Sequence, residues 1–344
     1  MEQGNMIENL LSGPLTVGWD ITHMCNLRCK HCYADAGKRS EHEFTMEEIK
    51  RIVDELDSLG TILIALSGGE PLMRRDICEI ISYIRRKGIE VFLNTNGTML
   101  TKERICALRD AGLRHFEISF DGLGEQHDLI RGNGSFERAL RGFDNCIECG
   151  VTVGVLCTIF RSNVDSVGSI IDFFHDRGAV GVGFLRFIAS GRGAQNTDLQ
   201  ITSEQRQAVI AEVYNRRMDY GERFYLKIET PISILEAVKH PELMAKHTYS
   251  SFINRGCDGG ITSCQILHNG DVTFCPQMPT GNFNIHEHPM RYIWKNDPDF
   301  IKLRTRKYAG KCGQCQYESA CGGCRVEAYM KTGDVLGEDP GCWL

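Results

Sequence analysis

The chain has 344 residues, a formal net charge of −6 and 16 cysteines. A chain of this length can bury a substantial core and typically forms about two domains, or one barrel with an appendage. The mild acidity disfavours broad docking on nucleic acid or on an anionic membrane, because both bind clusters of basic side chains. The apolar runs fall far short of the roughly 20 residues of a membrane-spanning helix. The N-terminal residues lack the features of a signal peptide. The sequence therefore predicts a soluble cytoplasmic protein without nucleic-acid or membrane partners.

Short apolar runs alternate with amphipathic stretches over residues 16–225. The runs predict strands at Val17–Thr22, Ile62–Ser67, Glu90–Thr95, His115–Phe120, Val151–Thr158 and Val182–Phe187. A helical pattern follows each, most clearly Met46–Leu59, which Thr45 and Glu48 begin as a capping box. This alternation predicts an α/β fold in which six parallel strands close as a partial (β/α)6 TIM-like barrel. The chemistry of such a barrel lies at the carboxyl ends of its strands.

The pattern changes after the sixth predicted strand. Residues 226–256 are expected to connect two domains and to contain a helix around Ile232–Lys246. From Cys257 onward cysteine, glycine and aromatic residues replace the strand–helix rhythm, and Ile266–Phe274 predicts a hairpin with a type I′ turn at Asn269–Gly270. The expected division is an N-terminal segment 1–15, a barrel 16–225, a connecting segment 226–256 and a small cysteine-rich domain 257–344.

Three cysteines, Cys25, Cys29 and Cys32, follow the first predicted strand with the spacing C-x3-C-x2-C. A reducing cytoplasm disfavours structural disulfides, so cysteines this close together predict metal ligands. Thiolates select soft metals or iron–sulfur clusters, and three of them fit a 4Fe–4S cluster with one iron left open. The alternatives are a zinc site completed by His23 or His31, and buried cysteines without a ligand role.

This motif, at the end of the first strand of a βα barrel, resembles that of the radical S-adenosylmethionine (SAM) superfamily, and the likeness extends over most of the chain. The resemblance implies that Cys25, Cys29 and Cys32 hold a 4Fe–4S cluster whose open iron chelates SAM. Reductive cleavage of SAM then yields methionine and a 5′-deoxyadenosyl radical that abstracts hydrogen from a substrate. A reducing partner such as ferredoxin or flavodoxin is implied as well. His31 and Tyr33, beside the third cysteine, are candidates for a position near the adenine.

Polar residues end the later predicted strands. Ser67-Gly68-Gly69-Glu70-Pro71 ends the second strand and resembles the superfamily's GGE motif. That likeness implies that Glu70 and the backbone of Gly68 and Gly69 bind the methionine amino group of SAM. Asn and Asp at strand ends also cap helices and form turns, so a structural role is the alternative for the polar residues that end the later strands. The candidate contacts for SAM or substrate there are Asn96, Ser119, Asp121, Arg131, Thr158 and Arg186.

The C-terminal part carries eight cysteines, at Cys257, Cys264, Cys275, Cys312, Cys315, Cys321, Cys324 and Cys342. C-x2-C pairs are common zinc ligands, although zinc-ribbon pairs are normally about 15–20 residues apart. The arrangement resembles the SPASM domain, a C-terminal extension of radical SAM enzymes that carries auxiliary iron–sulfur clusters. The resemblance implies one cluster on Cys257, Cys264, Cys275 and Cys324, and a second on Cys312, Cys315, Cys321 and Cys342. One departure is the spacing of two residues before Cys324, where the family usually has three.

The resemblance leaves the substrate open. The C-terminal run looks most like enzymes of the alternative haem and haem d1 routes, which remove or oxidise side chains of an iron tetrapyrrole, and the 24 residues before Cys25 suit that type. Modification of a ribosomally made peptide is the second candidate and a small metabolite the third. Pro276 stands where sulfatase-maturing relatives have an aspartate base, which disfavours that role. The sequence therefore predicts a radical SAM oxidoreductase or lyase; a non-catalytic iron–sulfur or zinc scaffold is the alternative from another class.

Overall fold

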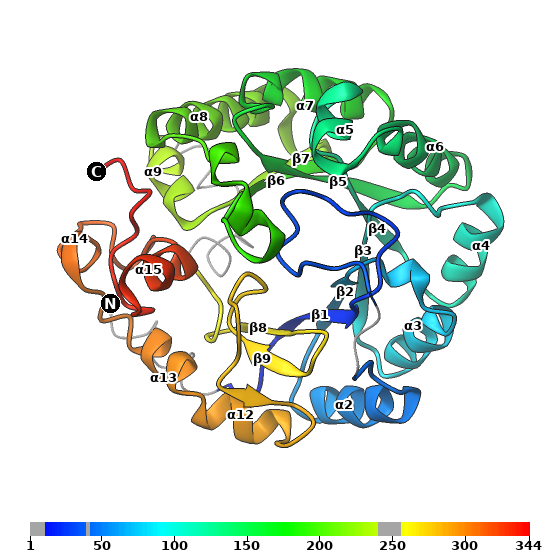
Figure 1. Cartoon of the computed structure of the whole chain (residues 1–344), viewed down its shortest axis with the longest axis horizontal. Helices are drawn as coiled ribbons and strands as arrows, with labels where there is room; N and C mark the ends of the chain where they lie inside the picture. Colours follow the sequence, from blue (N-terminus) through cyan, green and yellow to red (C-terminus); the bar gives the residue numbers. More distant parts are fainter. Residues whose placement is uncertain (1–10, 39–41, 240–255) are drawn as a thin grey trace.

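The computed structural model describes residues 11–38, 42–239 and 256–344. Within them, the strands form one sheet in the order β10-β9-β8-β1-β2-β3-β4-β5-β6-β7. Their bounds are β1 Thr16–Thr22, β2 Leu63–Gly68, β3 Glu90–Thr95, β4 His115–Ser119, β5 Thr152–Ile159, β6 Gly181–Arg186, β7 Tyr225–Glu229, β8 Ser263–Ile266, β9 Asp271–Thr273 and β10 Phe283–Asn284. Strands β1 to β7 are parallel, and β8 pairs with β1 in parallel. The sheet curves into an open barrel (Figure 1).

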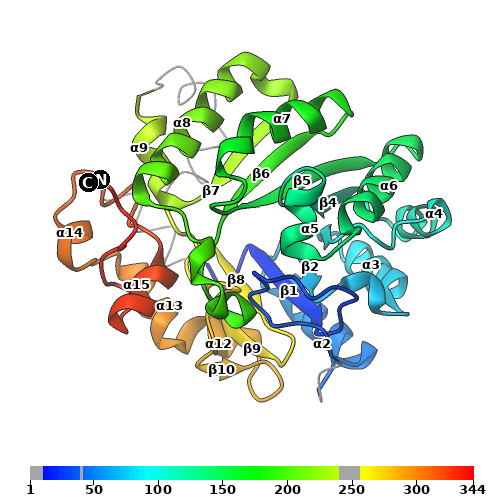
Figure 2. The same cartoon turned by 45° about the horizontal axis from the view of Figure 1, so that its top comes forward.

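Helices surround the outer face of this sheet, as Figures 1 and 2 show from two directions. Their bounds are α2 Met46–Ser58, α3 Ile77–Arg86, α4 Lys102–Asp110, α5 Glu125–Arg131, α6 Ser135–Glu148, α7 Val167–Asp176, α8 Ser203–Tyr220, α9 Ile234–Ala237, α12 Met290–Asn296, α13 Pro298–Thr305, α14 Gly310–Gly313 and α15 Arg325–Thr332. The last four lie beside β8 and β9, on one flank of the barrel. None of the helices in the described ranges is long and apolar enough to cross a membrane.

Helix α2 shows how the sequence produces these elements. Thr45 caps its first turn, and Glu48 completes the predicted capping box. Ile49, Ile52 and Leu56 recur at helical spacing and are fully buried against the sheet. Burial of each such side chain contributes roughly 1.5–3 kcal/mol. The helix ends one residue earlier than expected.

All six predicted strands are present, each within one residue of its expected ends. A seventh parallel strand, β7, lies in the predicted connecting segment and pairs with β6. It was missed because it is an edge strand on which only Leu226 is buried, while charged residues such as Lys227 alternate with it. Of the helix expected around Ile232–Lys246, the structure shows α9; residues 240–255 lie outside the described ranges.

The C-terminal part is joined to the barrel through sheet and core. Strand β8 continues the sheet beyond β1, with Val17 opposite Cys264. One apolar core runs from Trp19 on β1 to Ile293 and Phe300 on the C-terminal helices. The cysteine-rich part is therefore held against the barrel by apolar burial as well as by backbone pairing.

The predicted hairpin is present, but the predicted type I′ turn is wrong. A type I′ turn needs left-handed backbone at both central residues. Gly270 has φ +91°, whereas Asn269 is not among the left-handed residues of the described chain. The N–H of Gly270 donates to the carbonyl of Leu267 at 2.9 Å, and Leu267 pairs with Asp271. The result is a three-residue loop that places His268 at the hairpin tip, near the end of β1.

Candidate active site and auxiliary cysteine sites

The first three cysteines lie on the loop that follows β1, at the carboxyl end of the barrel, and all are partly buried. The backbone N–H groups of Leu27 and Ala36 donate to the sulfur atoms of Cys25 and Cys32, each at 3.4 Å. Burial raises the pKa of the Cys29 thiol to about 12. A thiolate at that depth needs nearby positive charge, which iron supplies, and N–H groups aimed at sulfur are typical of iron–sulfur sites. The donor set fits a 4Fe–4S cluster.

The predicted GGE turn after β2 holds this loop in place. The N–H of Gly69 donates to Thr22 O at 2.8 Å, and that of Glu70 donates to Met24 O at 2.7 Å. Gly68 has φ +123°, and a side chain at Gly69 would collide with the carbonyl of Met24. The two glycines are needed because the turn and the cysteine loop touch backbone to backbone.

The Glu70 side chain is fully buried and already engaged by the protein. Its carboxylate accepts hydrogen bonds from the Thr95 hydroxyl at 2.7 Å, from Asn96 N at 2.8 Å and from Leu72 N at 3.2 Å. Burial raises the pKa of this carboxyl. Glu70 therefore links the end of β2 to the end of β3, beside Cys25. The expected contact of the SAM amino group with Glu70 and with the backbone of the turn stays a prediction.

Asn96 and Arg131 both lie close to the cysteine loop. The Asn96 amide nitrogen donates to Asn26 Oδ1 at 2.8 Å and lies 4.0 Å from the sulfur of Cys25. Arg131, at the end of α5, interacts electrostatically with Cys29 and Cys25. The structure thus places both predicted residues beside the loop.

Asp121, Arg131 and Thr158 form a buried group behind this loop. Arg131 Nε donates to Asp121 Oδ2 at 2.6 Å, and Thr158 N donates to Asp121 Oδ1 at 2.9 Å. Burial opposes ionisation of Asp121, but the charge of Arg131 outweighs it and lowers the pKa of this carboxyl to about 2. Asp121 is therefore an anion that orients Arg131. Ser119 lies at the end of β4 and is half-buried.

Among the buried polar atoms that have no hydrogen-bond partner in the described residues are His31 Nδ1 and Asp20 Oδ2, at this end of the barrel. Burial lowers the pKa of His31 to about 4, so the ring is neutral at pH 7. Buried polar atoms are rarely left without a partner, and a bound ligand is one way to supply it. Their presence beside the cysteine loop fits a site that binds a polar cofactor.

Asp20 was not among the sequence candidates. Its Oδ1 accepts hydrogen bonds from Ser67 at 2.8 Å, Tyr33 at 2.9 Å and Gln265 at 3.0 Å. Burial raises its pKa to about 6. The one available signal was an acidic residue on the inward face of β1, five positions before Cys25.

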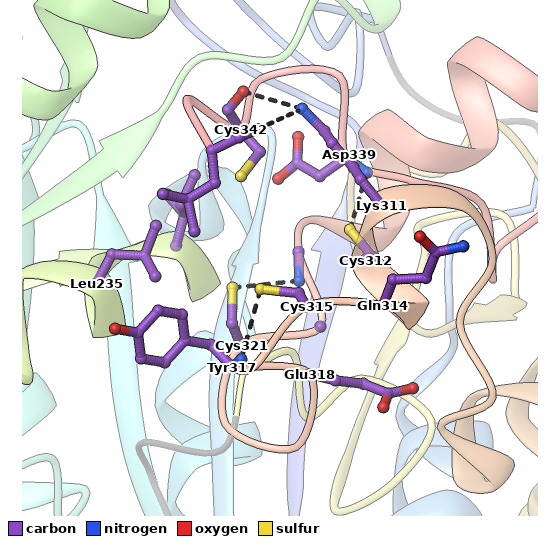
Figure 3. A pocket seen from close by; sticks show the side chains of 14 residues that line it. Leu235, Lys311, Cys312, Gln314, Cys315, Tyr317, Glu318, Cys321, Asp339 and Cys342 are labelled. Carbon is purple, nitrogen blue, oxygen red and sulfur yellow. Dashed lines mark hydrogen bonds between the residues drawn. The ribbon is translucent and has the colours of Figure 1, made fainter.

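Four of the C-terminal cysteines line one cavity of about 280 Å³. They are Cys312, Cys315, Cys321 and Cys342, the set expected to share the second auxiliary cluster, and Figure 3 shows them around the cavity. The N–H groups of Asp339, Tyr317 and Gly323 donate to three of these sulfur atoms at 3.4 Å. In the described chain no group of three or more His, Cys, Asp or Glu residues is arranged to hold a single metal ion. A 4Fe–4S cluster needs a wider arrangement, since each cysteine binds a separate iron.

The set expected for the first auxiliary cluster is only partly brought together. Burial raises the pKa of Cys257 to about 12, and the Cys324 thiol adds to that rise. Burial also raises the pKa of Cys275, with contributions from Cys324 and Cys257. Cys264 instead lies on β8 opposite Val17 of β1 and is packed into the apolar core.

Arg186, at the end of β6, does not join the residues around the cysteine loop. Its guanidinium binds both oxygens of Asp339, at 3.1 and 3.2 Å, and also pairs with Glu327. These partners belong to the C-terminal part, more than 140 residues away in the sequence. Arg186 therefore links the barrel to the C-terminal part. Its expected contact with SAM or substrate stays a prediction.

Comparison with known proteins shows which family the chain belongs to. Residues 19–174 match the radical SAM superfamily, and residues 257–324 match the SPASM iron–sulfur cluster-binding domain. The AdoMet-dependent heme synthase of Methanosarcina barkeri is 33% identical over 97% of this chain and 97% of its own length. The chain belongs to the radical SAM superfamily. The family and the cysteine-rich domain predicted from the sequence are thus confirmed, and they imply SAM and iron–sulfur clusters as cofactors.

Two further proteins resemble this radical SAM protein, one in sequence and one in fold. The mycofactocin maturase MftC of Mycobacterium tuberculosis is 30% identical over 97% of this chain and 84% of its own length. SuiB of Streptococcus suis, solved with its precursor peptide SuiA, has a TM-score of 0.79 and 18% identity over 99% of this chain and 79% of that chain. At that identity the likeness supports the fold, a partial barrel with a C-terminal domain.

We expect Gly69→Ala to empty the cysteine loop of iron. The added methyl group collides with the Met24 carbonyl, and the loop has to move because that neighbour is backbone. About four iron atoms per chain should be lost while the auxiliary iron remains. Gly88→Ala is the control for general backbone strain: an alanine is strained at its φ of +78°, but nothing lies within 4 Å of the added methyl group. Iron analysis after oxygen-free reconstitution checks this; equal iron loss in both variants would contradict it.

We expect Asp20→Asn to change how stability depends on pH. The folded pKa of Asp20, about 6, lies above its ordinary value of 3.8, so folding favours the protonated carboxyl. That stabilisation is complete below about pH 4 and is lost as the pH rises through 6. Relative to the neutral asparagine variant, the wild type should lose up to about 3 kcal/mol over this interval. Denaturant unfolding of both proteins from pH 4 to 7 measures it, and parallel curves would refute it.

Proposed function

We propose that this radical SAM enzyme acts on a side chain of an iron tetrapyrrole, with electrons from a reducing partner such as ferredoxin or flavodoxin. The observation that carries the proposal is the full-length likeness to an AdoMet-dependent heme synthase, which spans nearly all of both chains. The cysteine sets and the cavity in the C-terminal part support two auxiliary clusters beside the catalytic one.

Different residues around the cysteine loop would bind the cluster and SAM. Cys25, Cys29 and Cys32 would hold the cluster, and the backbone of Gly68 and Gly69 would meet the amino group of SAM. Bound there, the cluster and SAM supply hydrogen-atom abstraction from the substrate. The protein contributes orientation and the exclusion of side reactions.

The Arg131–Asp121 pair would set the charge of the site. Asp121 keeps the buried guanidinium in one position, and Arg131 places a positive charge near Cys29. That charge would favour thiolates and would also suit the carboxylate of SAM. Asn96, tied to Asn26, would hold the side of the loop that carries Cys25.

His268 supports an iron-containing substrate. It stacks on His23 with ring centroids 3.9 Å apart, which places it beside the cysteine loop. Burial lowers its pKa to about 4, and its Nδ1 is buried without a partner among the described residues. A neutral imidazole with a free nitrogen is a common ligand of iron. We propose that this ring contacts the tetrapyrrole iron.

The test is turnover of an iron porphyrin that carries propionate side chains, with SAM and a low-potential reductant in the absence of oxygen. We expect 5′-deoxyadenosine to form together with a change in porphyrin mass. We also expect His268→Ala to weaken binding of the iron porphyrin and to change its visible absorption. His288→Ala, on a ring that stacks on Tyr292 instead, should have neither effect. Failure of the wild type to bind the porphyrin would refute the proposal.

Peptide modification is the second candidate, favoured by the likeness to mycofactocin maturase MftC over 97% of this chain. Turnover of a precursor peptide without any effect on the porphyrin would support peptide modification and contradict action on a tetrapyrrole.

A further inference from the structure

Cys264 lies on the opposite face of β8 from the barrel interior. Its neighbour on the strand, Gln265, points inward and donates to Asp20 Oδ1 at 3.0 Å. Successive side chains of a strand point to opposite faces, so Cys264 points away from the barrel interior. There it is 4% exposed and belongs to the apolar core of the molecule. Its surroundings are those of a structural cysteine.

The three other cysteines of this set are brought together by backbone contacts. A side chain at Gly256 would collide with the carbonyl of Cys321, and one at Gly259 would collide with the carbonyl of Phe274. The residues on both sides of Cys257 therefore touch the segments that carry Cys324 and Cys275. The thiols of Cys257 and Cys275 both interact electrostatically with that of Cys324.

A polar atom in the same neighbourhood lacks a partner. Gln277, two residues after Cys275, has its amide oxygen buried without a hydrogen bond among the described residues. Its backbone N–H donates to the sulfur of Cys275. A buried acceptor without a donor is expected beside a site that takes a further ligand.

We propose that the auxiliary cluster on this side of the C-terminal part is held by three cysteines, Cys257, Cys275 and Cys324, and that its fourth iron takes an exchangeable ligand. This inference rests on the proposed function, since it assumes that auxiliary clusters are bound. A cluster held by four thiolates serves mainly in electron transfer, whereas one with an open iron can also bind a polar group of a substrate. The two auxiliary sites would then differ in kind, because four cysteines surround the other cavity.

Iron analysis separates Cys264 from the proposed ligands. Reconstituted wild-type protein should hold about twelve iron atoms per chain with matching sulfide. Cys264→Ala should keep all of them, as should Cys146→Ala, which removes another fully buried cysteine. Cys257→Ala and Cys324→Ala should each lose about four. Loss of about four iron atoms from the Cys264→Ala variant would overturn the inference, whatever the other variants lose, and would leave the proposed function standing. Wild-type protein with only four iron atoms would contradict both.

A spectroscopic test addresses the open iron and leaves Cys264 in place. Cys29→Ala protein lacks the catalytic cluster, so its reduced electron paramagnetic resonance spectrum reports the auxiliary clusters alone. Imidazole is the probe, and we expect it to shift the signal of one cluster. The shift should disappear in a Cys29→Ala, Cys257→Ala double variant. A spectrum that imidazole does not change would show that the chain itself supplies the fourth ligand and would overturn the open-iron part of the inference.

Discussion

Cys29→Ala is expected to abolish reductive cleavage of SAM and to remove about four iron atoms per chain. Cys29 lies at the centre of the loop after β1, where its thiol interacts electrostatically with those of both other cysteines of the motif. A cluster held by two cysteines would lose both an iron ligand and its orientation toward the GGE turn. Removing a group that only supports a metal ligand costs about 10–100-fold, so loss of a ligand itself should exceed that.

Cys315→Ala is the matched comparison. Cys315 lines the cavity of the C-terminal part, on a different segment from the cysteine loop. We expect Cys315→Ala to lower substrate turnover more than SAM cleavage, because the auxiliary site is not where SAM would bind. The measurement is 5′-deoxyadenosine formed with and without substrate, alongside iron per chain. Equal loss of both activities in the two variants, with the fold intact, would contradict this division of labour.

What could be predicted from the sequence depended on how local the determining contacts are. The loop of Cys25, Cys29 and Cys32 was found because three ligands within eight residues need no knowledge of the fold. Strand β3 was predicted to the residue because its apolar run is bounded on both sides by turn signals. Strand β7 was missed because an edge strand needs fewer apolar residues.

Contacts between residues far apart in the sequence could not be predicted from the sequence in this way. The role of Arg186 depends on Asp339, and the environment of Asp20 depends on Gln265. Each pair comes from segments that meet only in the folded sheet. The placement of Cys264 depends on the face of β8 that it occupies, and the spacing of the cysteines carries no information about that face.

Arg186→Gln is expected to lower the free energy of unfolding by about 3–5 kcal/mol. The Arg186 side chain is 6% exposed, and its partner Asp339 is not exposed at all. Burial would raise the pKa of Asp339, but the charge of Arg186 holds it below its ordinary value. Without the guanidinium, two buried carboxylates, Asp339 and Glu327, face each other with less compensation. Arg177→Gln is the control, because its exposed pair with Asp144 should contribute at most about 1 kcal/mol.

Arg186→Gln should also affect the auxiliary clusters, because Arg186 binds Asp339. The backbone N–H of Asp339 donates to the sulfur of Cys312 at 3.4 Å, and its carboxylate accepts from Cys324 N at 2.8 Å. One residue thus touches a cysteine of each proposed auxiliary site, and Arg186 fixes it to the end of β6. We expect Arg186→Gln to lower auxiliary iron and to change the reduction potential of the iron that remains, while SAM affinity stays within about twofold, a difference below roughly 0.5 kcal/mol. Iron analysis, redox titration and SAM binding measure the three effects. Weakened SAM binding with unchanged iron and stability would contradict this linking role and support the predicted contact of Arg186 with SAM, because only direct contact would then explain the loss.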